Sequence, residues 1–339
     1  MAMISSLQLL RFVAASLIVL HHSVREFSGL PAFSEFGVDI FFVISGFIIS
    51  HITQSDHEQF FTRRLIRIVP LYWLLTCAIA AIAYAAPQLL RNVKWDTCHA
   101  IASLLFIPWW TEYLKFEPIL PMGWTLNYEI WFYLLFYVAM QITFLHREVM
   151  CSLLIMCVYV TTNLLPLDRT APLAFYSDGL VFEFMFGMAL SVLYRRRKFM
   201  FDRVPRGVVL ACAIAAPGSF YYTTCVSTLG LPRSISWGLP ACVCVMVCLC
   251  SEGQFSRFPC WMNSAVLVGG EISYPLYLLH MFFIAGLSRL PLAPTLNVVE
   301  GFLLALLLSS VAAYMASQYF DKPIRRILSA ALLQRSSRA

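Results

Sequence analysis

LQLLRFVAASLIVLHH, residues Leu7–His22, is an almost entirely apolar stretch with an arginine near its middle and two histidines at its end. A membrane-spanning helix needs about 20 mostly apolar residues, because every backbone polar group must be hydrogen-bonded inside the hydrocarbon. A cleavable signal peptide would instead carry basic residues before the apolar stretch and small residues at a cleavage site. We therefore expect this stretch to be a retained first membrane span.

The composition of the whole chain supports the same conclusion. Of its 339 residues, 60% are hydrophobic and only 12% are charged, whereas soluble domains are about 25% charged. The net charge of +6 is expected to reflect membrane topology and not binding to nucleic acid. The eleven cysteines are scattered without the spacing of a zinc site, and we expect no metal.

Apolar stretches of similar length recur along the chain, and no soluble domain or linker separates them. We predict an all-α polytopic membrane protein with about ten transmembrane helices. The weaker stretch 97–110 is too short to cross and is expected to be one short re-entrant or interfacial segment. The predicted spans are residues 5–24, 35–52, 67–88, 124–145, 149–166, 175–194, 206–223, 233–250, 264–288 and 299–319.

The basic residues predict how these spans are oriented. With both termini in the cytoplasm, 16 of the 24 lysines and arginines fall on the cytoplasmic side, seven fall outside, and Arg11 lies within a span. This asymmetry is what the positive-inside rule requires. The counted residues include Arg91, Arg169, Arg257, Arg335 and Arg338. We expect a single transmembrane domain over residues 1–325 and a short basic cytoplasmic tail over residues 326–339.

Charged residues inside apolar spans suggest function, because a charge at the bilayer centre costs about 2.5–3.5 kcal/mol on insertion scales. Arg11 and His22 are eleven residues apart, which places them on one helix face about 16 Å apart along the axis. His21 points about 80° away from Arg11 and is the poorer candidate. From this geometry alone, an interhelical ion pair for Arg11 and a structural role for His22 remain alternatives.

Two motifs lie near the predicted outer ends of their spans. In GVDIFFVISGFIIS, residues 37–50, Asp39 is at the span boundary, and Gly37, Ser45 and Gly46 permit close helix packing. In GWTLNYEIWFY, residues 123–133, Glu129 stands among aromatic residues that include Trp124 and Tyr133. Aromatic residues are ordinary at a membrane interface, but carbohydrate sites often pair aromatic faces with a carboxylate.

Two further motifs complete the set. In FTRRLIRIVPLYW, residues 61–73, the group Arg63, Arg64 and Arg67 lies at the inner face, where arginines suit phosphate groups or anionic lipid equally. In SYPLYLLHM, residues 273–281, His280 lies in the outer half of its span. Glu183 and Glu271 are also at membrane depth, and the sequence assigns neither a role. Together these residues predict a polar track across the membrane, with Arg11 between its two ends.

These strings resemble the signatures of the acyltransferase-3 family of bacterial membrane O-acyltransferases. The matching features are an arginine and a histidine separated by ten residues (Arg11 and His22), then GVDIFFVISGF, RRLIRIVPLYW, WTLNYEIWFY and SYPLYLLH, in that order along the chain. Within the family the chain is most similar to exopolysaccharide and lipopolysaccharide acetyltransferases without an extra hydrolase domain. His21 directly precedes His22, and only His22 has the family's spacing from Arg11.

The resemblance implies transfer of an acyl group, expected to be acetyl, from acyl-CoA to a carbohydrate hydroxyl in a bacterial inner membrane. Arg63, Arg64 and Arg67 would bind the CoA phosphates, and the pantetheine arm would pass Arg11. His22 would be the general base, with Glu129 orienting it or holding the sugar. His280 would be a second acid/base or an oxyanion donor. Asp39, Trp124 and Tyr133 are the expected substrate-binding residues.

Several alternatives stay open at this level. Direct transfer and a transient acyl-histidine are both allowed. Ten spans with intramembrane charges also suit a transporter or flippase of a lipid-linked saccharide, although no pair of broken spans occurs at matching positions in two halves. A non-catalytic scaffold for envelope assembly is a third interpretation. The expected partners are the carbohydrate acceptor, membrane lipids and polysaccharide-assembly proteins.

Overall fold

The computed structural model describes residues 4–29, 35–53, 59–90, 93–113, 115–143, 145–166, 168, 170–225, 230–255, 258–291 and 295–336. Within these ranges every regular element is a helix, apart from an isolated antiparallel bridge between Trp110 and Phe116, and this confirms the predicted all-α class. Four residues counted in the charge asymmetry, Arg91, Arg169, Arg257 and Arg338, lie outside the described residues, as does the side chain of Arg335.

Six helices in the described part of the chain are long and apolar enough to cross a membrane, which confirms a multi-pass membrane protein. They are Ser5–Ser28, Phe60–Ala85, Arg147–Leu164, Ser234–Phe255, Cys260–Leu287 and Val298–Leu333. The helix Gly37–Ile52 is apolar but shorter. The count of about ten crossings and the cytoplasmic position of both termini stay predictions.

The stretch 97–110 forms only one short helix, α4 (Thr97–Leu104). Its eight residues extend over about 12 Å, well short of the roughly 30 Å of a hydrocarbon core. Such a helix cannot cross a bilayer by itself, as we expected of a re-entrant or interfacial segment.

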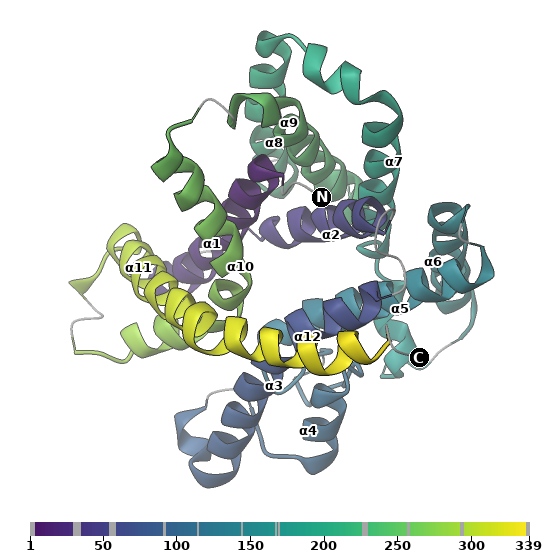
Figure 1. Ribbon diagram of the computed structural model, residues 1–339. Coiled ribbons are helices and arrows are strands. Elements are labelled where there is room, and N and C mark those ends of the chain that lie inside the picture. The colour runs from purple at the N-terminus through teal and green to yellow at the C-terminus, as the bar shows by residue number, and fades with distance from the viewer. Residues whose placement is uncertain are drawn as a thin grey trace. The chain divides into compact units, whose positions relative to one another are not determined.

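Contacts between helices divide the chain into two compact units, and the helices of both are labelled in Figure 1. We call Met1–Ser55 with Phe182–Gln318 the histidine unit, and Asp56–Val181 with Tyr319–Ala339 the arginine unit. The histidine unit contains α1 (Ser5–Ser28), α2 (Gly37–Ile52), nearly all of α7 (Val181–Arg203), α8 (Arg206–Cys225), the short π-helix η4 (Ser234–Gly238), α9 (Leu239–Phe255), α10 (Cys260–Leu287) and α11 (Val298–Ala316).

Helix α1 is central to the histidine unit, where it packs against α2, α9, α10 and α11. Glycines allow its closest neighbours to approach. A Cβ atom on Gly37 of α2 would lie 2.4 Å from the carbonyl oxygen of Ala14 in α1. A Cβ atom on Gly46 would lie 2.2 Å from the carbonyl oxygen of Phe184 in α7. Both distances are too short for any side chain, which confirms the predicted packing role of these two glycines.

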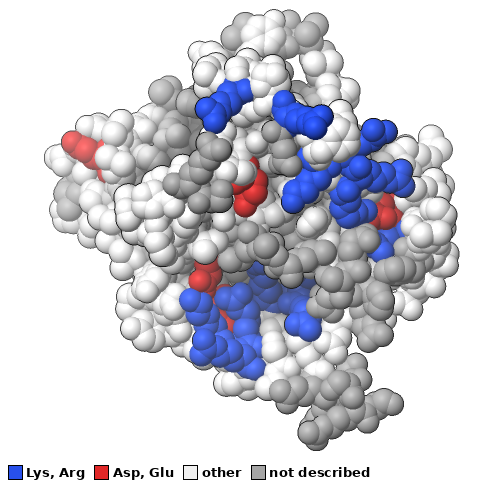
Figure 2. Space-filling view, turned by 45° about the horizontal axis from the view of Figure 1, so that its top comes forward, with Lys and Arg blue, Asp and Glu red and all other residues white. Residues whose placement is uncertain are grey.

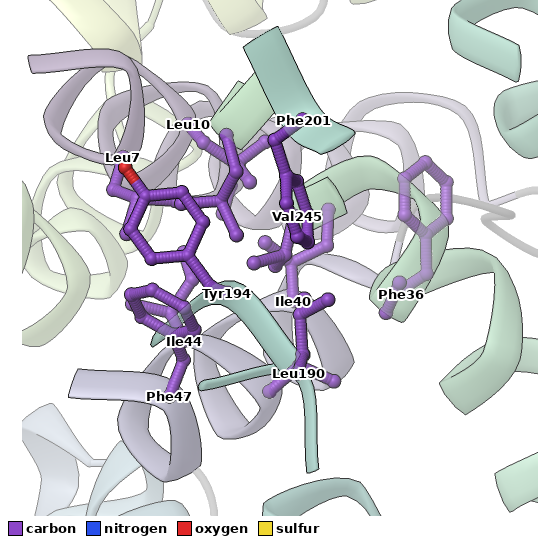
Figure 3. Close-up of a cluster of buried hydrophobic side chains, with 14 of the residues drawn as sticks. Leu7, Leu10, Phe36, Ile40, Ile44, Phe47, Leu190, Tyr194, Phe201 and Val245 are labelled. Atoms are coloured by element: carbon purple, nitrogen blue, oxygen red, sulfur yellow. The ribbon is translucent and has the colours of Figure 1, made fainter. Parts of the chain in front are cut away.

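A cluster of buried apolar side chains joins five helices of this unit, α1, α2, α7, α8 and α9 (Figure 3). Ile40, Ile44 and Phe47 of α2 follow the spacing of one helix face and point into this cluster. Their neighbours are Leu7 and Leu10 of α1, Leu190, Tyr194 and Phe201 of α7, and Val245 of α9. This packing holds α1 and α2, which carry three of the predicted site residues, in one arrangement.

The first turn of α1 is capped by a carboxylate from another helix. Both oxygens of Glu252 in α9 accept hydrogen bonds, one from the backbone N–H of Ser5 at 2.9 Å and one from that of Ser6 at 2.8 Å. The first N–H groups of a helix have no partner within it, and its N-terminus favours negative charge. Glu252 therefore supplies from α9 the cap that α1 itself lacks.

Replacing Glu252 with alanine is expected to lower the free energy of unfolding by about 1–2 kcal/mol, because two backbone donors lose a charged acceptor. Thermal unfolding in detergent micelles measures the change. Glutamine keeps one acceptor oxygen and should give an intermediate loss. An alanine variant as stable as the wild type would show that the cap contributes nothing.

The arginine unit is built around α3 (Phe60–Ala85), which packs against α4, α5 (Trp124–Ile142) and α12 (Lys322–Ser336). It also contains the short helices η1 (Pro87–Leu89), η2 (Pro121–Gly123) and η3 (Pro172–Ser177), together with α6 (Arg147–Leu164). The short π-helix η6 (Ser317–Asp321) leads from α11 into α12. Residues 326–336 of the predicted tail are thus helical.

Candidate active site

The histidine unit brings His22 of α1 and His280 of α10 together, with ring centroids 5.2 Å apart and ring planes tilted by 42°. The two helices run in parallel, since Gln8 lies against Gly270 and His22 lies against His280. A Cβ atom on Gly270 would lie 2.5 Å from the Cβ atom of Gln8, so a glycine is required for this approach. The ring of His21 lies 5.1 Å from that of His22, edge to face.

His280 is completely buried, and one of its ring nitrogens is oriented by the backbone. Its Nδ1 atom lies 2.7 Å from the carbonyl oxygen of Tyr277. A carbonyl oxygen can only accept, so Nδ1 carries the proton and donates it. In the neutral ring Nε2 is then an acceptor, and it is buried without a hydrogen-bond partner among the described residues. An unpaired buried acceptor costs about 1–3 kcal/mol, which a ligand hydroxyl donating to Nε2 would recover.

Arg11 and His22 lie on the uninterrupted helix α1, as their spacing requires. The Arg11 side chain is buried, and its Nη1 atom donates to Oε1 of Gln8 over 3.4 Å. A cation is thus held inside the helix packing of the histidine unit, on the same helix as one of the paired imidazoles.

Asp39 has a partner that the sequence did not suggest. Nε of Arg233 donates to Oδ1 of Asp39 and Nη2 donates to Oδ2, both over 3.0 Å. The Asp39 side chain is fully buried, whereas that of Arg233 is 25% exposed. Its guanidinium carbon also lies 4.5 Å from the ring centroid of Trp237, in η4. Both carboxylate oxygens of Asp39 thus accept hydrogen bonds from one guanidinium group, and substrate binding by this residue stays a prediction.

Glu183 and Glu271, to which the sequence assigned no role, both lie in the histidine unit. The Glu183 side chain lies against Gly238 of η4 and interacts electrostatically with Arg233. Oε1 of Glu271 in α10 accepts a hydrogen bond from the Ser317 hydroxyl over 2.8 Å. Glu271 therefore ties α10 to the end of α11.

The arginine unit gathers the other predicted residues. The guanidinium carbon of Arg64 lies 5.8 Å from the ring centroid of Tyr133, and the Tyr133 hydroxyl donates to Oε1 of Glu129. Arg67 lies within electrostatic range of the Glu129 carboxylate. Arg63 is exposed and donates from Nη2 to Oε1 of Gln59 over 3.3 Å. Figure 2 shows that lysines and arginines gather in groups on the face that it displays.

This neighbourhood differs from the one that the topology suggested. The sequence placed Glu129 toward the outer face and the arginines toward the inner face, yet the structure makes Glu129 and Tyr133 neighbours of Arg64 and Arg67. Glu129 is therefore positioned to orient the arginine group through charge and through the Tyr133 hydroxyl.

Trp124 begins an aromatic cluster at the start of α5. Its ring lies 6.1 Å from that of Tyr128, which contacts both Phe175 and Tyr176. Tyr176 in turn stacks on Trp131 at 4.7 Å. The Trp124 side chain is partly exposed, so it can present an aromatic face to a sugar ring. Among the described residues, no group of three or more His, Cys, Asp or Glu side chains is arranged to hold a metal ion.

Comparison with known proteins identifies the family. The Acyl_transf_3 family model, described as an acyltransferase domain, matches residues 4–318. The chain is 30% identical over 301 residues to the exopolysaccharide production protein ExoZ of Rhizobium meliloti (strain 1021), an alignment that covers 86% of this chain and 89% of ExoZ.

Two other relatives match over shorter stretches. The O-acetyltransferase OatA of Staphylococcus aureus (strain NCTC 8325 / PS 47) is 32% identical over 154 residues, which are 40% of this chain and 24% of OatA. YrhL of Bacillus subtilis (strain 168), whose name describes a proposed peptidoglycan O-acetyltransferase, is 28% identical over 195 residues, or 50% of this chain and 30% of YrhL. No solved structure matches the chain. The family model and the ExoZ alignment both span most of the sequence, and the chain therefore belongs to the acyltransferase-3 family.

Proposed function

We propose that this protein moves an acyl group, acetyl being the expected one, from acyl-CoA to a hydroxyl group of a surface or exported carbohydrate. Family membership makes it a membrane O-acyltransferase. The names of the relatives, which refer to exopolysaccharide, O-acetyl transfer and peptidoglycan, support an acetyl group and a carbohydrate acceptor. Because these relatives are bacterial and acyl-CoA is cytosolic, the bacterial inner membrane is the expected location.

The observation that carries this proposal is the imidazole pair of His22 and His280, with Nε2 of His280 buried and unpaired. A sugar hydroxyl has a pKa far above 7, so it attacks a thioester only when a positioned base takes its proton. Histidine titrates near neutrality and suits this role. His22 is the proposed base, and His280, whose tautomer is set by Tyr277, is the second acid/base.

The proposed chemical step exchanges a thioester for an oxygen ester. The sugar oxygen forms a bond to the thioester carbonyl carbon while an imidazole accepts the hydroxyl proton. The tetrahedral intermediate then breaks its carbon–sulfur bond, and the imidazolium returns the proton to the leaving thiolate. The products are a sugar ester and free CoA. Arg11 is a buried cation on the same helix, but it lies about 16 Å from His22 along the axis, and it is proposed to line the passage of the pantetheine arm.

The donor phosphates are proposed to bind the arginine unit. Arg64 and Arg67 present guanidinium groups whose planar geometry matches phosphate oxygens. The Tyr133 ring lies beside the Arg64 guanidinium group, and Glu129, which accepts from Tyr133, adds a negative charge near both arginines. The partly exposed Trp124 is a candidate for stacking against the acceptor sugar.

The direct test uses the full chain reconstituted in lipid nanodiscs with radiolabelled acetyl-CoA and an oligosaccharide acceptor. Transfer should place label in an alkali-labile sugar ester and release one CoA for each ester formed. Translocation of a labelled lipid-linked saccharide with the thioester left intact would instead identify a flippase.

Replacing Arg64 and Arg67 together with glutamine is expected to raise the KM for acetyl-CoA by about 10-fold or more, because each charge-assisted hydrogen bond contributes about 1.5–3 kcal/mol. The KM for the acceptor should change little. Arg63→Gln should have a smaller effect, since Arg63 is exposed and bonded to Gln59. Arg206→Gln, at an exposed position of α8, is the matched control. A double variant with an unchanged KM for acetyl-CoA would show that the phosphates bind elsewhere.

A further inference from the structure

Helix α12 lies alongside the first part of α3 in the arginine unit (Figure 1). Nε2 of Gln59, the residue before α3, donates to the carbonyl oxygen of Leu333 near the end of α12 over 3.2 Å. Arg325, eight residues before Leu333, lies near Arg67, eight residues after Gln59. The two helices are therefore antiparallel, and the start of α12 lies beside residues that follow the beginning of α3. The last helix of the chain thus reaches the segment that carries the predicted donor site.

This packing adds a third cation to Arg64 and Arg67. Arg325 interacts electrostatically with Arg67, as Arg64 does. Asp321 holds the Arg325 side chain: Oδ2 of Asp321 lies 2.9 Å from Nη2, and the Asp321 carbonyl oxygen accepts from Nε over 3.4 Å. The Asp321 side chain is 4% exposed and that of Arg325 is 28% exposed. Arg325 is thus fixed from the protein side and still accessible to a ligand.

The charges of this group favour an anionic ligand. Three guanidinium groups, of Arg64, Arg67 and Arg325, lie near two carboxylates, of Glu129 and Asp321, so positive charge is in excess. Like charges held close together in a low dielectric repel one another, and a bound polyanion removes that repulsion. Guanidinium groups bind phosphate oxygens in pairs of parallel hydrogen bonds, so phosphate esters are the anions that they fit best.

We propose that Arg325 binds a phosphate group of the acyl donor together with Arg64 and Arg67, and that Asp321 positions its guanidinium group. This inference rests on the proposed acyl-CoA dependence. CoA carries a pyrophosphate and a 3′-phosphate, which together match a group of three arginines. A phospholipid headgroup offers the same phosphate chemistry, so the experiment must separate the two sources.

Calorimetry with the full chain in nanodiscs of neutral phosphatidylcholine measures the Kd for CoA without competition from anionic lipid. Arg325→Gln should raise this Kd by about 10-fold or more. Arg325→Lys keeps the charge but loses the planar pair of donors and should give a smaller rise. Asp321→Asn should also raise the Kd by less than Arg325→Gln, because the guanidinium group remains but is no longer held. Arg326→Gln, at the next and exposed position of α12, should bind CoA as the wild type does.

Acetyl-pantetheine, which lacks the phosphates, separates donor binding from damage to the fold. Arg325→Gln should use this short donor with the kcat/KM of the wild type. If Arg325→Gln does not fold, Arg325→Lys provides the test instead. A wild-type affinity of Arg325→Lys for CoA would then refute the proposal. Equal loss of CoA affinity in Arg326→Gln would also refute it, since the effect would then be one of general charge.

Two other outcomes have distinct meanings. If Arg325→Gln binds CoA normally but retains less phosphatidylglycerol in native mass spectrometry, its ligand is a lipid headgroup and the donor assignment is overturned. If the wild-type protein neither binds CoA nor transfers an acetyl group, the proposed function itself fails. If the wild-type protein transfers acetyl and Arg325→Gln binds CoA with the wild-type Kd, only the role of Arg325 is overturned.

Discussion

Replacing His22 with alanine is expected to lower kcat for acyl transfer by about 10²–10⁴-fold, the usual contribution of a positioned general base. The loss should fall on kcat more than on the KM for acetyl-CoA, because the proton leaves the sugar hydroxyl only in the transition state. Single-turnover transfer to an oligosaccharide, with the protein in nanodiscs, measures the chemical step alone. The thermal unfolding midpoint of each variant separates lost chemistry from lost fold.

His280 should behave as part of the same unit. Its Nε2 atom is a buried acceptor beside the His22 ring, so His280→Gln is expected to lower kcat by a similar factor. Residues that act together are strongly non-additive, and the double variant should therefore be little slower than either single variant. His146→Ala, at an exposed position before α6, is the matched control. Full activity in a folded His22→Ala variant would remove the base from the proposed mechanism.

Replacing Asp39 with alanine is expected to lower the free energy of unfolding by about 3 kcal/mol. Removing one partner of a buried ion pair leaves the other charge uncompensated, which typically costs about 3–5 kcal/mol. The lower end applies here because the Arg233 side chain is 25% exposed and can be partly hydrated. Asp39 also lies in the first turn of α2, where a negative charge is favourable. Thermal or denaturant unfolding in micelles measures the loss.

A double-mutant cycle isolates this ion pair from other effects. Combining Asp39→Ala with Arg233→Ala should be less destabilising than the sum of the single changes, because no charge is then left unpaired. The pair of Lys94 and Glu112 is a suitable control, since the N–O distance of 2.7 Å is short but both side chains are half exposed or more. Glu112→Gln should leave stability almost unchanged, as exposed pairs do. Equal effects of Asp39→Ala and Glu112→Gln would contradict a buried role for Asp39.

For Glu129, the sequence predicted a functional role but not the residues around it. Its position among aromatic residues of an apolar stretch marked it as functional, because an ionisable group is costly there. The pattern could not name its neighbours, Arg64, Arg67 and Tyr133, since these lie on two helices and only packing brings them together. Arg233 was not among the candidates, because a lone arginine at the end of a predicted span carries no signal of the buried Asp39 that it contacts.

Membrane character, the all-α class, the close-packing glycines 37 and 46, and the candidate residues follow from the sequence by itself. Each depends on a local property, namely the length of an apolar stretch, the spacing along one helix or the cost of a charge in lipid. Only the tertiary structure decided that His22 faces His280, that Tyr277 sets the His280 tautomer and that α12 brings Arg325 to α3. Periodicity indicates which residues share one helix face, whereas the partner of that face depends on how all the helices pack together.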